Sequence, residues 1–129
     1  MNDGTIQERT EPAIYLHSFE AVKELLVLTR SFPKPSRYVL GRLLDERSLE
    51  FLLKLNGIVG PSGVRSHERA RRLEMLSDLS RGLDEIRILL RLSRETGAMS
   101  AGQNQEVLGR LVEIGRQLGG LIRAAKAVN

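Results

Sequence analysis

Apolar residues recur at spacings of three and four along almost the whole chain, and no long stretch alternates with a period of two. This spacing is typical of helices that bury one face, whereas half-buried strands alternate strictly. Four prolines and twelve glycines punctuate the chain and separate its periodic stretches. The sequence therefore predicts an all-α protein with helices over residues 13–31, 37–56, 66–95 and 101–125.

Short local signals mark the ends of these helices. Thr10 offers a capping hydroxyl before the first helix, and Ser36 offers one before the second. Gly97 is suited to end the third helix, because glycine accepts the left-handed backbone that often closes a helix. Ser100 and Gln103 have the S-x-x-Q form of a capping box, so they predict the start of the fourth helix.

Each predicted helix has one apolar face. These faces comprise Tyr15, Phe19, Val22 and Leu26; Leu40, Leu43, Leu44, Phe51, Leu52 and Leu55; Leu76, Leu79, Leu83, Ile86 and Leu90; and Val107, Leu111, Ile114, Leu118, Leu121 and Ala125. Long helices joined by short connections pack antiparallel. We therefore expect an antiparallel up-down four-helix bundle over residues 13–127, preceded by a flexible N-terminal segment over residues 1–12.

Basic residues outnumber acidic residues in this chain. Lys and Arg total 20 and Asp and Glu total 16, which gives a net charge of +4 and a pI near 10.0. Sixteen of the basic residues are Arg, whose planar guanidinium group suits phosphate recognition. This balance favours a polyanionic partner.

The arginines are arranged along the last two predicted helices. Arg87, Arg91 and Arg94 are spaced i, i+4 and i+7, so they form one stripe on the third helix. Arg116 and Arg123 lie seven residues apart on the outer face of the fourth helix. We expect these side chains to contact phosphates or acidic partner surfaces. A further basic group has no assigned role: Arg65, Arg69, Arg71 and Arg72.

The fourth predicted helix carries a second line of apolar and small residues beside its main face. This line consists of Leu108, Val112, Gly115, Gly119 and Ile122. Ile88 and Leu92 on the third helix also lie away from its main face, so the two helices have more apolar surface than one bundle needs. We expect the second line to form a homo-oligomer interface. The alternative is a wide core face whose glycines allow tight packing within one chain.

Several kinds of catalytic site are excluded or unsupported. The chain has no cysteine, which rules out disulfides, thiol nucleophiles and Cys-ligated metals. Neither His17 nor His67 has a Glu three residues earlier, and no phosphate-binding loop, nucleophile elbow or zinc-binding His-Glu-x-x-His helix is present. The sequence predicts a non-enzyme with no metal and no cofactor.

Neither a signal segment nor an apolar run of about 20 residues, the length that spans a bilayer, is found in the sequence. We therefore expect a cytoplasmic protein that does not bind membranes. Single-stranded bases stack on exposed aromatic side chains, but most of the aromatic residues are expected on helix faces or at helix ends. Contact with the phosphate backbone is thus favoured over base readout, and RNA and DNA remain equally open.

Four segments of the chain resemble one protein family. They are residues 32–41 (FPKPSRYVLG), 83–92 (LDEIRILLRL), 97–100 (GAMS) and 113–120 (EIGRQLGG). Together they resemble the accessory variability determinant (Avd-like) proteins of diversity-generating retroelements. The resemblance covers about residues 12–125.

This resemblance implies a four-helix bundle assembled as a homopentamer. The family's basic surface binds nucleic acid and the element's reverse transcriptase and supports mutagenic retrohoming, without catalysis of its own. Arg87, Arg91 and Arg116 fall at positions where the family has basic residues, whereas Leu121 stands where relatives often have an aromatic residue.

A second family is also similar in its first helices, namely the four-helix-bundle proteins encoded in ribosomal RNA intervening sequences. A protein of this kind would be a protein-interaction scaffold without a direct role in nucleic-acid binding. Its arginine stripes would then meet acidic surfaces of partner proteins. The sequence leaves this alternative open, and the number of subunits comes from the first resemblance alone.

Overall fold

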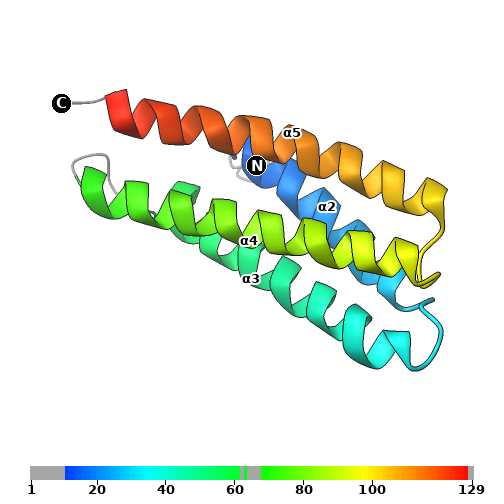
Figure 1. Cartoon of the computed structure of the whole chain (residues 1–129). Coiled ribbons are helices and arrows are strands. Elements are labelled where there is room, and N and C mark those ends of the chain that lie inside the picture. The colour runs from blue at the N-terminus through cyan, green and yellow to red at the C-terminus, as the bar shows by residue number, and fades with distance from the viewer. Residues whose placement is uncertain (1–10, 62, 64–67, 128–129) are drawn as a thin grey trace, which may run out of the picture.

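A computed structural model of the chain describes residues 11–61, 63 and 68–127. Regular secondary structure in this part of the chain is entirely helical (Figure 1). Its elements are α2 (Ala13–Thr29), a π-helical segment (Arg37–Gly41), α3 (Arg42–Val59), α4 (Arg69–Glu95) and α5 (Ala101–Ala127). The predicted all-α class with four long helices is therefore confirmed for the described residues.

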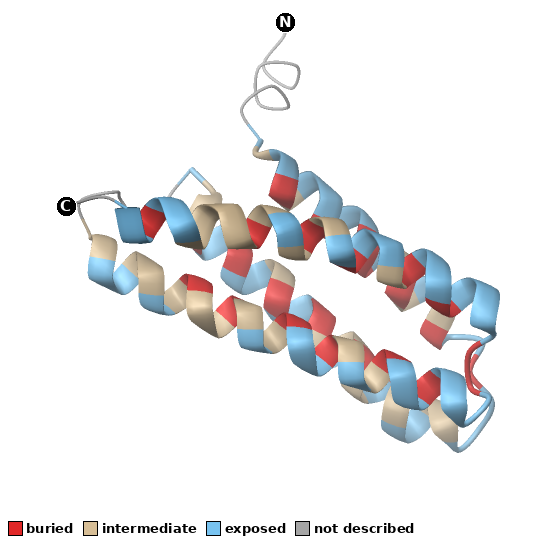
Figure 2. Ribbon diagram, turned by 45° about the horizontal axis from the view of Figure 1, so that its top comes forward, coloured by how far each residue is buried: buried red, intermediate tan, exposed pale blue. Residues whose placement is uncertain are grey.

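The four long helices surround one core. α2 packs against α3 and α5, and α4 also packs against α3 and α5. Figure 1 shows the helices lying lengthwise along one another, with the α2–α3 and α4–α5 connections at the same end of the molecule. Buried residues face the space between the helices in Figure 2. The molecule is a helical bundle, because each amphipathic helix can bury its apolar face only against its neighbours.

The predicted apolar faces of α4 and α5 agree well with the structure. Every residue predicted for the face of α4 is buried, and so are those predicted for α5 except Leu121, which is half-buried. On α3, Leu44, Phe51 and Leu55 are buried, while Leu43, Leu52 and Leu40 of the preceding π-helical segment are half-buried. Burying a Leu side chain fully is worth about 1.5–3 kcal/mol relative to its exposure to water.

The predicted apolar face of α2 agrees with the structure only in part, since Val22 is buried and Tyr15 packs against the core. Phe19 is 44% exposed, and Tyr15 and Leu26 are only half-buried. The buried residues of α2 are Ile14, Ser18, Ala21, Val22, Leu25 and Thr29. Large apolar residues occur around most of this helix, so their spacing alone did not identify the inner face. Small and polar side chains occupy part of that face instead.

The helix ends confirm some signals and correct another. The backbone N–H of Gln103 donates to Ser100 Oγ at 3.1 Å, and the Ser100 N–H donates to Gln103 Oε1 at 3.2 Å, as a capping box requires. Gly97 has φ +82°, which is the left-handed conformation expected after a helix. Ser36, by contrast, makes no side-chain capping bond. The chain instead enters α3 through the π-helical segment, beside the buried Phe32.

A few predictions concern residues outside the described part of the chain. These include most of the segment 1–12, the capping residue Thr10, Arg65 and His67. α4 begins at Arg69, three residues later than the predicted start at residue 66. None of the described helices combines the length and apolar character needed to cross a membrane.

Candidate functional site

Arg87 lies in the seam between α4 and α5 and makes contacts to both helices. Its Nη1 donates to Asp84 Oδ1 at 3.2 Å, and its Nη2 donates to the backbone O of Leu111 at 3.4 Å. The side chain is 38% exposed. A Cβ atom added at Gly115 would lie 2.7 Å from Arg87 Nη2. The guanidinium group therefore occupies the space that the missing side chain of Gly115 leaves.

Arg91 and Arg94 are the exposed members of the α4 stripe. Arg91 Nε donates to Glu95 Oε2 at 2.8 Å, one helical turn further on. This hydrogen bond and the attraction between the two charges lower the pKa of Glu95. Arg94 lies in the last turn of α4 and forms no salt bridge with any described residue. The positive charge of the stripe is thus least compensated at Arg94.

Arg116 belongs to a polar network that links α5 to α2. Its Nε donates to Glu113 Oε1 at 3.1 Å, and Gln117 Nε2 donates to Glu113 Oε2 at 2.8 Å. The hydrogen bonds from Arg116 and then from Gln117 lower the pKa of Glu113 to about 2. Gln117 Nε2 also lies 2.8 Å from His17 Nδ1 on α2. Arg116 is therefore held by its own helix.

Arg123 differs from Arg116 in its surroundings. It is exposed, and it forms no salt bridge with the described residues. Its Nη1 lies 3.4 Å from the position that a Cβ on Gly119 would take, and its Nη2 lies 3.9 Å from the corresponding position on Gly120. The guanidinium group of Arg123 consequently lies over the glycines of α5.

The second apolar line of α5 is only partly exposed. Leu108 and Ile122 are half-buried and pack against the core, whereas Val112 is 62% exposed. Gly115 and Gly119 lie beneath the guanidinium groups described above. The predicted interface and part of the predicted binding surface therefore share one side of the molecule, where α4 meets α5. Both assignments stay predictions.

Surplus apolar surface is present on the same two helices. Ile88 is 60% exposed and Leu92 is 46% exposed, both on α4. With Val112 on α5, they are among the large apolar side chains that the described chain leaves exposed, as are Val27 on α2 and Leu53 on α3. Such surface is compatible with the expected self-association.

One basic residue at the start of α4 contacts the neighbouring end of α3. Arg72 Nη1 donates to the backbone O of Ile58 at 3.3 Å, near the last turn of α3. Arg71 Nη1 lies 3.4 Å from Glu68 Oε2. Because free carbonyls at a helix end attract cations, Arg72 has a structural role that the sequence pattern did not assign.

Sequence reasoning missed a second basic surface at the connection between α2 and α3. Arg30 and Lys34 are exposed there and form no salt bridge with the described residues. Tyr38 lies at a helix end, as expected, but it is 63% exposed. Phe19, which was predicted on an apolar helix face, is also exposed. The sequence does contain a signal for this basic surface, because residues 25–44 include four basic residues and no acidic residue.

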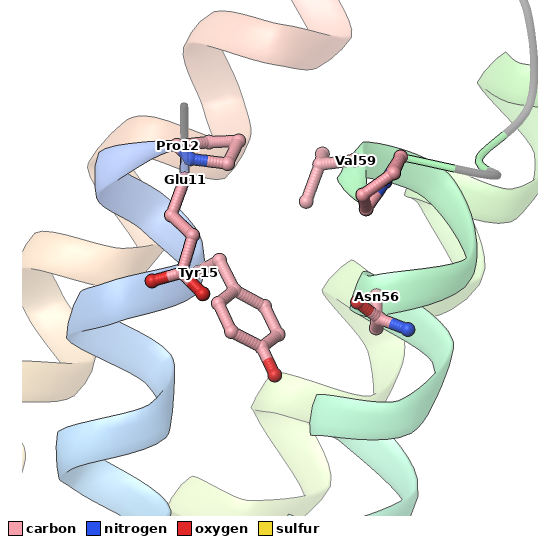
Figure 3. Close-up of a pocket in the computed structure, with 7 residues that line it drawn as sticks. Glu11, Pro12, Tyr15, Asn56 and Val59 are labelled. Carbon is pink, nitrogen blue, oxygen red and sulfur yellow. The ribbon is translucent and has the colours of Figure 1, made fainter. Parts of the chain in front are cut away.

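A hollow of about 350 Å³ lies between the start of α2 and the end of α3. Figure 3 shows Glu11 and Tyr15 on one side of it and Asn56 and Val59 on the other. Its lining combines one carboxylate, one phenol and one amide with apolar side chains. These groups can form hydrogen bonds with a small molecule. Among the described residues, no cluster of three or more His, Asp or Glu side chains could hold a metal ion.

Two acidic side chains approach each other where α2 meets α5. Arg110 Nε donates to Glu24 Oε1 at 2.6 Å. The pKa of Glu24 is nevertheless raised, first because the carboxylate is partly removed from water and then because it shares a hydrogen bond with Glu106. Arg110 therefore offsets only part of the unfavourable environment of this carboxylate.

Comparisons with known proteins add no family assignment. No protein-family model matches the chain. A search of curated proteins likewise finds no match.

Proposed function

We propose that this chain is a non-catalytic, basic accessory protein of a diversity-generating retroelement. In this proposal it forms an antiparallel up-down four-helix bundle, assembles into a cytoplasmic homo-oligomer of five subunits, and binds RNA or DNA through phosphates. It also binds the reverse transcriptase of the element and so supports mutagenic retrohoming. The family part of the proposal is supported by the four segments that resemble Avd-like proteins.

One observation carries the nucleic-acid part of this proposal. Exposed cations that form no salt bridge with a described residue occur on α4, on α5 and in the α2–α3 connection. They are Arg30, Lys34, Arg94, Arg123 and Lys126. Phosphates bound to such cations release condensed counterions, which is the main sequence-independent term in nucleic-acid binding. A surface whose cations are already paired with carboxylates would gain much less binding free energy from counterion release.

The scaffold function remains a second candidate because of a specific observation. Arg87, Arg91 and Arg116 each form a salt bridge with an acid of their own helix. Their charges are thus partly used within the chain, as expected for a solvated helix surface. A scaffold would use the remaining exposed apolar residues, with the arginines at the edge of the contact.

Fluorescence anisotropy with labelled single-stranded RNA, single-stranded DNA and duplex DNA over a salt series tests the main proposal. We expect affinity to fall steeply with salt, since the slope reflects the number of phosphates neutralised. The Arg94→Gln/Arg123→Gln variant should bind more weakly and show a shallower slope, by about 1.4 for a single strand. Light scattering of the same samples gives the number of subunits.

The matched control removes a complete ion pair. The Arg91→Gln/Glu95→Gln variant leaves the net charge unchanged and should bind within about twofold of the wild type. Absence of wild-type binding at low salt contradicts the nucleic-acid part and favours the scaffold. Co-purification with the reverse transcriptase encoded beside the gene tests the remaining part, and failure to co-purify with any such enzyme contradicts it.

A further inference from the structure

The connection between α2 and α3 combines uncompensated charge with an exposed aromatic ring. Residues 25–44 contain four basic residues, Arg30, Lys34, Arg37 and Arg42, and no acidic residue. Arg42 is paired with Glu46 on α3, at 3.1 Å. The other three form no salt bridge within the described part of the chain. We call the group Arg30, Lys34, Arg37 and Tyr38 the corner surface.

Tyr38 and Arg37 form a defined unit within the corner surface. The Arg37 guanidinium carbon lies 5.8 Å from the centroid of the Tyr38 ring, within the range of a cation–π contact. Arg37 Nη1 also donates to the backbone O of Arg30 at 3.3 Å. The tyrosine ring remains 63% exposed. An aromatic ring is thus presented to solvent beside a guanidinium group that the end of α2 holds in place.

The backbone under this unit is well anchored. The Arg37 N–H donates to Pro33 O and the Tyr38 N–H donates to Pro35 O, both at 2.9 Å. Phe32 is buried and fixes the connection to the core. An exposed ring on an anchored backbone loses little conformational freedom when a ligand stacks on it.

A purely structural reason accounts for only part of the corner surface. Cations near the end of α2 interact favourably with its free carbonyls, which explains the contact from Arg37 to Arg30 O. It does not explain why Tyr38 is exposed or why Lys34 is exposed without a salt bridge to any described residue. A ligand that combines anionic groups with flat rings would satisfy both features.

We propose that the corner surface binds single-stranded nucleic acid, with one unpaired base stacked on Tyr38 and neighbouring phosphates bound by Arg30, Lys34 and Arg37. This inference rests on the proposed nucleic-acid binding and assigns it a site. Base–aromatic stacking requires a base that is free of its neighbours, as single strands offer and duplexes do not. The corner surface therefore confers a preference for single strands, whereas Arg94 and Arg123 contact phosphates of either form.

The test compares a labelled 20-nucleotide oligo-uridine with a 20-base-pair DNA duplex by anisotropy. Tyr38→Ala should weaken binding of the single strand about tenfold, since one stacked base contributes about that much or more, and should leave duplex binding within about twofold. Tyr38→Phe should behave as the wild type because the ring is kept. Arg30→Gln/Lys34→Gln should reduce the salt slope for the single strand by about 1.4.

Phe19→Ala is the matched control, because Phe19 is an exposed aromatic on α2 with Lys23 6.0 Å from its ring. That cation is paired with Glu20 at 3.2 Å, so this variant should bind both probes as the wild type does. Thermal unfolding verifies that each variant is folded.

The outcomes separate the two proposals. If the wild type binds both probes and Tyr38→Ala binds the single strand equally well, the corner surface is overturned while nucleic-acid binding stands. Equal weakening for both probes, or equal weakening by Phe19→Ala, also overturns the stacking role of Tyr38. If the wild type binds neither probe at low salt but binds poly-glutamate, both proposals fail and an acidic protein partner is indicated.

Discussion

Replacing Gly115 by alanine tests whether this glycine serves the chain itself or a contact between subunits. The structure places Arg87 Nη2 2.7 Å from the new Cβ position and a Leu83 methyl group at 3.5 Å. The second distance is an ordinary contact, whereas the first requires Arg87 to move. We therefore expect Gly115→Ala to act mainly by displacing the guanidinium group from the backbone O of Leu111.

Two opposing terms set the size of the effect on stability. Alanine in the interior of a helix is favoured over glycine by about 0.5–1 kcal/mol. Loss of the Arg87 contact to Leu111 O costs about 0.5 kcal/mol, the low end for a hydrogen bond, because this bond is long, at 3.4 Å, and partly exposed to water. The free energy of unfolding should thus rise by about 0–0.5 kcal/mol.

Gly109→Ala provides the matched control on the same helix. A Cβ at position 109 would have no neighbour within 4 Å, so the free energy of unfolding should rise by the full 0.5–1 kcal/mol or so. Urea denaturation gives both values, and the melting temperature should rise by about 4 °C per kcal/mol. In an Arg87→Met background the difference between the two alanine variants should disappear, since its cause has been removed.

Light scattering over a concentration series shows whether Gly115 makes room for Arg87 within one chain or for a contact between subunits. If Gly115 serves only Arg87, the assembly state of Gly115→Ala should equal that of the wild type. A variant with raised monomer stability and a smaller particle mass would refute this reasoning, because the methyl group would then be blocking a close contact between subunits. Equal stabilisation at positions 109 and 115 would show that Arg87 does not occupy the space over Gly115.

Three further predictions follow from buried or strongly paired groups. Ser18→Ala should raise the free energy of unfolding by about 1 kcal/mol in urea denaturation, because Ser18 Oγ is buried without a hydrogen-bond partner among the described residues; a lower value would indicate a missing partner. Asn104→Ala should lower it by about 1–3 kcal/mol, since buried Asn104 Nδ2 donates to Leu90 O at 2.9 Å; an unchanged value would contradict that bond. The pKa of Glu113, lowered to about 2 from an ordinary value of 4.5, means that its contribution to stability is complete above pH 4.5 and is lost as the pH falls towards 2. A carboxyl titration followed by NMR should show this midpoint, and Arg116→Gln should raise it.

The sequence was most informative where one apolar face dominated a helix. In α4, Leu76, Leu79, Leu83, Ile86 and Leu90 are the large apolar residues of a strict three-four repeat, and all are buried. The remaining positions of that helix are mostly charged, so only one orientation buries apolar surface without burying charge. The capping box before α5 was equally clear, because its two hydrogen bonds depend on neighbouring residues alone.

The failures arise where polar or small side chains are buried by tertiary contacts. Ser18 and Thr29 lie on the inner face of α2, and Asn104 lies on that of α5. Thr29 Oγ1 donates to Asp45 Oδ1 of α3 at 2.6 Å, a partner that no local pattern reveals. Periodicity counts large apolar residues and so overlooks such positions.

The sequence predicted which arginines lie on the candidate surface, but not which of them form salt bridges. The spacing of Arg87, Arg91 and Arg94 placed them on one helix flank. It did not show that Asp84 would pair with Arg87 and Glu95 with Arg91 rather than with other basic residues. Only the structure shows that Arg91 forms a salt bridge with Glu95 whereas Arg94 forms none with a described residue. Tyr38 was missed for a related reason, since an apolar ring near a helix end is expected to be buried, whereas here Phe32 takes that place.

The side on which α4 meets α5 brings the two expected activities into one place. Val112 exposes apolar surface there, with half-buried Leu108 and Ile122 on the same helix. Arg87 and Arg123 lie over glycines of α5. Stable protein contacts have an apolar centre and a charged, hydrated rim. Assembly through these apolar residues is therefore compatible with phosphate binding only if the arginines lie at the rim, where like charges from adjacent subunits stay apart. In that arrangement salt weakens nucleic-acid binding steeply and assembly little, because rim charges are screened and apolar burial is not. An assembly that instead placed these arginines at its centre would become more stable as salt screens their repulsion.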